Sequence, residues 1–528
     1  MAATGPIDDE GLLPGGLLGD GEDGRDRRTL LAGTAQNLVG LVVFVLGTFG
    51  ANVLVARSFG GAAAGAIALG VVTLATQLAF VAAAGTRFGM DMAAVREVAI
   101  EAGAGRVERI RGIVDRSLGV AALASLAVAL PTFAAAPWIA ERLTDRPEAE
   151  GAIRWAAVAL PFVAATFVSL GASRGLKVMR HTLLVQWVGQ PLLWIALMPL
   201  AWRVERSAGG AVAAYAVSWI VAAVGARLLW SREVRAFGRG PAAPGESGRL
   251  IRYGAPRAPA ALLSQGLFWV DYFVASAFVA RGVVSAEDLG IYSSSVRVAL
   301  AMVLFLTAVS YVFSPFVADL HARGERERLD GLFKSITRWT VAATVPLLLL
   351  MLVAPAPLLR IFGGSAFAGG ADALRILLVG QTVNVGVGAA GFVLIMAGRT
   401  GWDLVVYALS FVLDLALALL LVPRFGVEGA ALAQTATVAA SNAFRLWLVH
   451  RFVGIQPYDR RYLRLVPAAV GAAVAMVATH AALSGGAWPI DLAGTGLAGL
   501  AVYLPLLVGV GLPTEERRAV LRLLGRST

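Results

Sequence analysis

The sequence contains no cysteine. Disulfides, thiolate metal sites, iron–sulfur clusters and cysteine nucleophiles are therefore excluded, although this says little about the compartment. Histidine is scarce too, and the wide spacing of its four copies indicates no metal site; they are His181, His321, His450 and His480. A Walker A sequence is also missing, so we expect no direct use of ATP and no bound cofactor.

Charged residues are rare as well, at 15% of the chain, whereas hydrophobic residues make up 58% and the mean hydropathy is +0.74. A water-soluble protein of this composition would expose too much apolar surface. We predict an all-α polytopic membrane protein with about fourteen spans of roughly 20 residues each. They lie near residues 30–56, 63–85, 113–136, 152–172, 182–201, 208–230, 256–280, 289–318, 335–358, 371–397, 402–422, 427–449, 463–483 and 490–511.

The net charge is +11, and most of the 45 Lys and Arg residues fall in every second connection between the predicted spans. Positively charged connections stay on the cytoplasmic side, so both termini are expected there. This bias explains the basic charge without a nucleic acid partner. The N-terminal residues lack the basic start and the continuous apolar core of a signal peptide. We therefore expect a multi-pass protein of the cell membrane, surrounded by membrane lipids.

The two halves of the chain resemble each other. The shift that places Gly210-Ala211 on Gly429-Ala430 also places Asn52 on Asp271. Six spans in each half would make the two copies parallel, an arrangement typical of transporters that alternate access around a site between two lobes. The predicted parts are a flexible cytosolic tail (1–28), an N-lobe (29–230), a cytosolic inter-lobe loop (231–249), a C-lobe (250–451), two further spans (452–511) and a cytosolic amphipathic tail (512–528).

One glycine-rich motif is a false match. Residues 386–391 fit the dinucleotide-binding pattern Gly-x-Gly-x-x-Gly, but that pattern needs a strand before it, and none is expected within a membrane span. We predict that these small residues allow close helix packing or a bend.

Polar side chains inside the predicted spans are the candidate binding or coupling residues. Asp271 and Arg297 lie deep in consecutive spans, where an unpaired charge is costly. Arg297 is the best candidate to bind a diphosphate, and Asp271 to bind a proton or the cargo; alternatively, the two form a structural ion pair. Arg257, near a span end, either reaches lipid headgroups or meets the cargo. The other candidates either contact the cargo or join helices, and they are Asn52, Gln381, Asn384 and Asp414.

Several motifs of the second half point to a known family. They are Tyr253-Gly254-Ala255-Pro256, Asp271, Leu289-Gly290-Ile291-Tyr292 and the segment 423–431. Together they resemble the second lobe of the polysaccharide exporter and O-antigen flippase branch of the MOP transporter superfamily, over about residues 29–450. The resemblance implies the two-lobed MOP flippase fold. It also implies the flipping of a polyprenyl-diphosphate-linked oligosaccharide from the inner to the outer leaflet for surface polysaccharide biosynthesis. The first lobe departs from this pattern, since it has Asn52 in place of Asp271.

Two alternatives are weighed against this function. An ion-coupled drug or cation antiporter of the same superfamily would usually have more acidic residues in the first lobe, and Asn52 argues mildly against it. A membrane-embedded polysaccharide polymerase or acyltransferase would need a catalytic group on a large external loop, whereas the predicted external loops are short and lack histidine. We therefore expect a transporter and not an enzyme. H+ or Na+ coupling is expected, and glycosyltransferases or a polymerase of the same pathway are candidate partners.

Overall fold

The computed structural model describes residues 22–238, 240, 245–255, 257–397, 399–512 and 517. Most of the two predicted tails and part of the predicted inter-lobe loop, including residues 241–244, lie outside these ranges. Every element in the described ranges is helical. Ten of these helices are long and apolar enough to cross a membrane, or eleven if one bent pair counts as a single span. The predicted all-helical membrane fold is therefore confirmed.

The N-lobe follows the predicted spans closely. Its elements are α1 (Glu22–Arg57), α2 (Ala62–Thr86), α3 (Met90–Gly103), η1 (Val107–Arg109), α4 (Ile110–Ala134), α5 (Ala136–Thr144), α6 (Ala149–Gly175), η2 (Thr182–Gly189), α7 (Gln190–Val204) and α8 (Ala208–Glu233). The short helix α9 (Glu246–Gly254) packs on α3 and leads into the C-lobe.

The C-lobe and the last two spans are more often interrupted. Their elements are α10 (Arg257–Gly266), α11 (Val270–Ala277), α12 (Ala286–Ala322), α13 (Arg326–Val353), α14 (Pro355–Gly363), η3 (Ser365–Gly370), α15 (Ala371–Val387), α16 (Ala390–Met396), α17 (Thr400–Phe452), η4 (Arg460–Arg464), α18 (Leu465–Leu483), α19 (Trp488–Leu506) and η5 (Leu507–Gly511). Helices α18 and α19 pair with each other and pack against α13.

Glycine accounts for two of these interruptions. Gly388 has a φ of 68° and separates α15 from α16, which are bent by 43°. The predicted bend in the glycine-rich motif is therefore observed. Gly426, with φ 58° and ψ −134°, kinks α17 where two separate spans were predicted, and glycine adopts such angles because it has no Cβ. The span predicted as continuous over 256–280 was wrong in one respect, because it breaks after Gly266 into α10 and α11.

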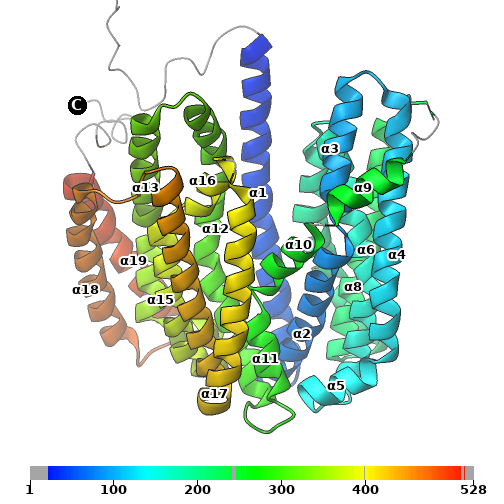
Figure 1. Ribbon diagram of the computed structural model, residues 1–528. Coiled ribbons are helices and arrows are strands. Elements are labelled where there is room, and N and C mark those ends of the chain that lie inside the picture. Colours follow the sequence, from blue (N-terminus) through cyan, green and yellow to red (C-terminus); the bar gives the residue numbers. More distant parts are fainter. Residues whose placement is uncertain are drawn as a thin grey trace, which may run out of the picture.

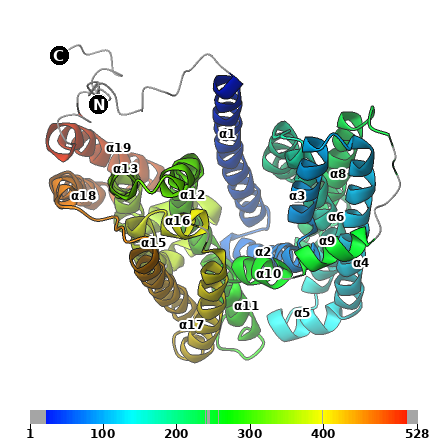
Figure 2. The same ribbon diagram turned by 45° about the horizontal axis from the view of Figure 1, so that its top comes forward.

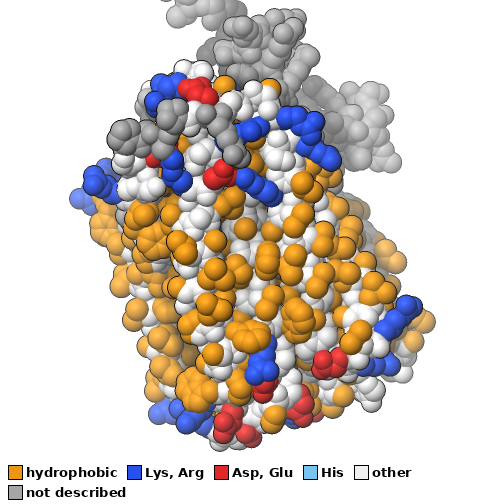
Figure 3. All heavy atoms as spheres, turned by 90° about the vertical axis from the view of Figure 1, so that its right-hand side faces the viewer, with side chains coloured by type: hydrophobic (Ala, Val, Ile, Leu, Met, Phe, Trp, Pro, Cys, Tyr) orange, Lys and Arg blue, Asp and Glu red, His pale blue; other side chains and the backbone are white. Residues whose placement is uncertain are grey.

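The two lobes stand side by side, with α1 and α2 of the N-lobe next to α10, α11 and α12 of the C-lobe (Figures 1 and 2). We call the end that carries α5 and the kink of α17 the α5 end, and the opposite end, with α3 and α9, the α9 end. The N-lobe face in Figure 3 is covered by apolar side chains across its middle, while charged side chains gather toward both ends. This distribution suits a bundle that spans a bilayer.

Candidate functional site at the lobe contact

The lobes touch through backbone atoms where α2 meets α12. A Cβ atom added to Gly290 would stand 1.8 Å from the carbonyl oxygen of Ala66, and one added to Gly70 would stand 3.3 Å from the Cα of Gly290. Only residues without a Cβ permit such close helix packing. We call this contact, between residues 66–73 of α2 and 290–297 of α12, the seam. Toward the α5 end, Arg57 of α1 adds a hydrogen bond from its Nε to the carbonyl oxygen of Ile361, at 2.9 Å.

Arg297 lies in the seam and bridges the lobes. Its Nη2 donates to the hydroxyl of Thr73 in the N-lobe at 2.9 Å, and its Nη1 donates to the carbonyl of Ser293 at 3.0 Å. The guanidinium also stands over the Trp269 ring, 5.6 Å from its centroid. Among the described residues, no ion pair joins Arg297 to Asp271, so the predicted structural pair is not formed. The charge of Arg297 is therefore held by neutral groups.

Two carboxylates lie deeper in the C-lobe, away from the seam. Asp271 in α11 and Asp414 in α17 are both fully buried and close enough for their charges to interact. The Oδ2 atom of Asp271 accepts a hydrogen bond from the Tyr292 hydroxyl. The hydroxyl of Thr437 lies next to the carboxylate of Asp414, and no Lys or Arg in the described part of the chain pairs with Asp271 or Asp414. Keeping two neighbouring buried carboxylates ionised without a cation has a large free-energy cost. This cluster is therefore suited to hold a proton or a small cation.

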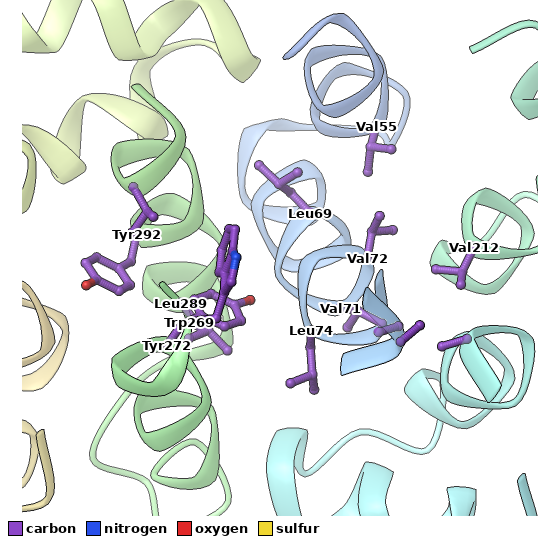
Figure 4. Close-up of a cluster of buried hydrophobic side chains, with 14 of the residues drawn as sticks. Val55, Leu69, Val71, Val72, Leu74, Val212, Trp269, Tyr272, Leu289 and Tyr292 are labelled. Atoms are coloured by element: carbon purple, nitrogen blue, oxygen red, sulfur yellow. The ribbon is translucent and has the colours of Figure 1, made fainter. Parts of the chain in front are cut away.

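A pair of tyrosines links the carboxylates to the seam. The rings of Tyr272 and Tyr292 are stacked, with centroids 6.4 Å apart. Tyr292 binds Asp271, whereas the hydroxyl of Tyr272 donates to the carbonyl of Gly70 across the seam at 2.8 Å. Figure 4 shows Trp269 and Tyr272 between the lobes and Tyr292 pointing away from α2. The two adjacent rings therefore form a continuous line of contacts from the carboxylate pair to the lobe contact.

The predicted amides Gln381 and Asn384 belong to a separate network inside the C-lobe. Asn384 donates to Gln381 at 3.1 Å within α15, and Asn442 of α17 donates to Asn384 at 3.2 Å. Such amide bonds hold membrane helices together. This arrangement supports the structural interpretation of these residues.

Asn52 and Arg257 lie apart from both clusters. Asn52 is buried in α1, and its side-chain amide donates to the carbonyl of Thr48 in its own helix at 2.6 Å. Arg257 is exposed at the start of α10, with its guanidinium 5.1 Å from the Tyr253 ring centroid. The structure therefore brings together Asp271, Asp414 and, through the tyrosines, Arg297, but not these two.

Sequence reasoning did not select four residues that now belong to the site: Thr73, Trp269, Tyr292 and Thr437. Tyr292 could have been found, because it ends a motif that carries the family resemblance. Thr73, Trp269 and Thr437 are ordinary residues of membrane helices, and no pattern in the sequence distinguishes them.

Outside the membrane spans, an ion pair fastens the turn between α3 and η1. Arg106 Nε lies 2.6 Å from Glu101 Oε2, and this hydrogen bond, together with the positive charge, lowers the pKa of Glu101 from its ordinary value. The pair belongs to the α9 end and has no contact with the carboxylate cluster.

The sequence profile of the MatE family matches residues 42–200 and 260–420, one segment in each lobe. This chain belongs to the MatE family. It is thus a multi-pass membrane transporter of the MOP superfamily and not an enzyme, as the sequence predicted.

Two solved structures show the same fold as this MatE-family chain. Lipid II flippase MurJ in an inward closed conformation matches with a TM-score of 0.70 and 13% identity, covering 94% of this chain and 100% of MurJ. A multidrug resistance MATE family transporter in an inward-facing conformation matches with a TM-score of 0.65 and 15% identity, covering 81% of this chain and 98% of that chain. The two-lobed fold expected from the resemblance is confirmed.

A curated relative of this MatE-family chain comes from Haloferax volcanii. It is named "Probable low-salt glycan biosynthesis flippase Agl15" and is 25% identical over 192 residues. The aligned region spans 36% of this chain and only 39% of the relative.

Proposed function

We propose that this transporter flips a polyprenyl-diphosphate-linked oligosaccharide from the inner to the outer leaflet, for cell-surface polysaccharide biosynthesis. The sequence match to a glycan biosynthesis flippase carries the choice of cargo. The coverage of 94% of this chain by MurJ, against 81% by the MATE transporter, supports it. An ion-coupled drug antiporter is the second candidate, because that MATE transporter shares the fold.

The proposed orientation places the α5 end outside the cell. The connections at the α9 end carry most of the Lys and Arg residues, which favours the cytoplasmic side for that end and for both termini. The seam and the Arg57–Ile361 hydrogen bond then close the outer side. Cargo would enter from the cytoplasmic side and leave after the seam opens.

Arg297 is the proposed binding group for the diphosphate. A guanidinium binds phosphate oxygens with two parallel hydrogen bonds, which are stronger than a bond to a neutral hydroxyl. A diphosphate that reaches Arg297 would compete with Thr73 for the same N–H groups. Cargo binding would thus remove one of the bonds that hold the lobes together, which couples recognition to opening of the seam.

Asp271 and Asp414 are the proposed coupling pair, taking up H+ or Na+. Ligand binding at Asp271 would disturb its bond from Tyr292 and, through the ring stack, the bond from Tyr272 to Gly70. The ion and the cargo would then act on the same seam from two sides. Because the two ligands bias one equilibrium, they would be coupled thermodynamically.

The test is transport by the purified protein in liposomes. A fluorescent polyprenyl-diphosphate oligosaccharide is placed in the inner leaflet, and its appearance outside is measured with a membrane-impermeant glycosidase or quencher, with and without Na+ or pH gradients. We expect gradient-dependent flipping by the wild type and none by empty liposomes. If the lipid stays in place while a cationic dye is exchanged for the ion, the drug antiporter is the correct function.

A further inference from the structure

A small cavity opens at the α5 end of the C-lobe. Its volume is about 140 Å³, and its walls come from the start of α12, from η3 and from the kink of α17. This volume holds several water molecules. Among its lining residues are Asp288, Gly369, Glu428 and Tyr292.

The charges that line the cavity have one sign. Asp288 and Glu428 supply carboxylates, and no Lys or Arg belongs to the described lining. Ser285 orients Asp288, with its hydroxyl 2.7 Å from Oδ2. An acidic pocket with low-dielectric walls concentrates cations.

One lining residue of the cavity also contacts the buried carboxylate pair. Tyr292 is one of the lining residues, and its hydroxyl donates a hydrogen bond to Asp271, so one residue contacts both the cavity and the buried pair. Beyond it lie Asp271 and Asp414, two buried carboxylates with which no Lys or Arg of the described chain pairs. The acidic lining of the cavity and the missing cationic partner of the two buried carboxylates are separate observations, and both favour the binding of a cation.

We propose that this cavity is the outer vestibule through which a monovalent cation, H+ or Na+, reaches the Asp271–Asp414 pair. Tyr292 is its inner gate, and Glu428 and Asp288 attract the ion. This inference rests on the proposed function and adds to it the route by which the coupling ion reaches its site. Because the vestibule lies within the C-lobe, the ion enters from outside while the seam between the lobes is closed. Ion entry and cargo release therefore use different openings.

The absence of native cysteine permits a clean accessibility test. A Cβ added to Gly369, in the vestibule wall, meets no atom within 4 Å, and the same holds for Gly60 in the α1–α2 turn at the same end of the molecule. Gly369→Cys and Gly60→Cys are therefore matched variants. Each is treated with a membrane-impermeant trimethylammonium thiol reagent, in intact cells and in inverted vesicles, with Na+, with N-methylglucamine in its place, and at several pH values.

We expect external reagent to modify both cysteines, and Na+ or H+ to slow the modification of Gly369→Cys alone. Modification of Gly369→Cys should reduce ion-driven transport about fivefold or more, and that of Gly60→Cys should have little effect. Without any reagent, Glu428→Gln should raise the ion concentration for half-maximal transport about fivefold while leaving the maximal rate unchanged, as expected for a charge that steers the ion.

An inaccessible Gly369→Cys, or a modified one with unaltered ion dependence, would overturn the vestibule. In that case, loss of ion dependence in Asp414→Asn would still support the coupling pair and the proposed function. Conversely, ion protection of Gly369→Cys needs no cargo, so it would stand even if no lipid-linked sugar were transported.

Discussion

The two lobes are copies of one architecture, but their interiors differ in charge. At the position that the repeat assigns to both, α1 of the N-lobe buries Asn52, which bonds to its own helix, whereas α11 of the C-lobe buries Asp271 beside a second carboxylate. The N-lobe contributes backbone and hydroxyl groups to the seam, and the C-lobe contributes Arg297. A duplicated bundle can therefore take the charged groups of its seam and of its carboxylate cluster from one copy, while the other copy supplies neutral groups to that seam.

Of the changes proposed here, the loss of the Arg297 side chain should lower the rate of flipping most. We expect Arg297→Ala to lower flipping at least about 30-fold, because truncating a buried, hydrogen-bonded charge costs about 2 kcal/mol or more. Arg297→Lys should recover only part of the rate, since lysine lacks the planar fork. The measurement is liposome flipping after verified insertion. Arg257→Ala, in the same lobe, is the control, and normal flipping by Arg297→Ala would return Arg297 to a purely structural role.

Neutralising one carboxylate of the buried pair should have the second largest effect on flipping. We expect Asp414→Asn to reduce gradient-driven flipping about tenfold and to abolish its dependence on Na+ or H+, because the ion loses a charged ligand. Asn52→Ala, at the N-lobe position that corresponds to Asp271, should keep the ion dependence. Initial rates at a series of ion concentrations test both variants. If Asn52→Ala changed the ion dependence as much as Asp414→Asn, the proposed asymmetry between the lobes would be wrong.

A methyl group in the seam should disturb both lobes together. Gly290→Ala would place its Cβ against the carbonyl oxygen of Ala66, and such overpacking costs about 1–3 kcal/mol. Gly70→Ala, whose Cβ would have 3.3 Å to its nearest neighbour, should cost less. Thermal unfolding in detergent compares the two. Equal melting temperatures for both variants would mean that the seam is looser than described.

Disrupting the amide network should lower the stability of the C-lobe by a smaller amount and leave transport coupling unchanged. Asn384→Ala removes bonds to Gln381 and Asn442, and we expect a loss of about 1 kcal/mol in stability, with ion dependence intact. A changed ion dependence would instead add Asn384 to the coupling site.

The smallest effect is expected at the Glu101–Arg106 pair of the N-lobe. Folding lowers the pKa of Glu101 below its ordinary value of 4.5. At a pH above 4.5 the ion pair therefore stabilises the folded protein, and this stabilisation is lost as the pH falls through the lowered pKa. Glu101→Gln should therefore lower the melting temperature slightly at pH 7 and not at low pH. A difference that persists in acid would point to packing instead of charge.

Much of the fold could be predicted from the sequence, since apolar length and the bias of arginine depend on the solvent rather than on details of packing. The break between α10 and α11 could not, because it depends on tertiary packing: α10 ends at Gly266, where an added Cβ would stand 3.0 Å from the ring of Phe411 in α17. Of the site, Asp271, Arg297 and Asp414 could be selected as charges within spans. Their partners could not, because Thr73, Trp269 and Thr437 are common in any membrane helix.

By itself, the sequence determined the membrane class, the two parallel lobes and which few charges lie within them, because each unpaired charge in a bilayer is costly and therefore conspicuous. Only the tertiary structure decided which of these charges meet. The packing of α11 on α17 brings Asp271 to Asp414, and the packing of α12 on α2 places Arg297 against Thr73. Those contacts depend on the relative positions of helices far apart in the chain, which hydropathy does not encode.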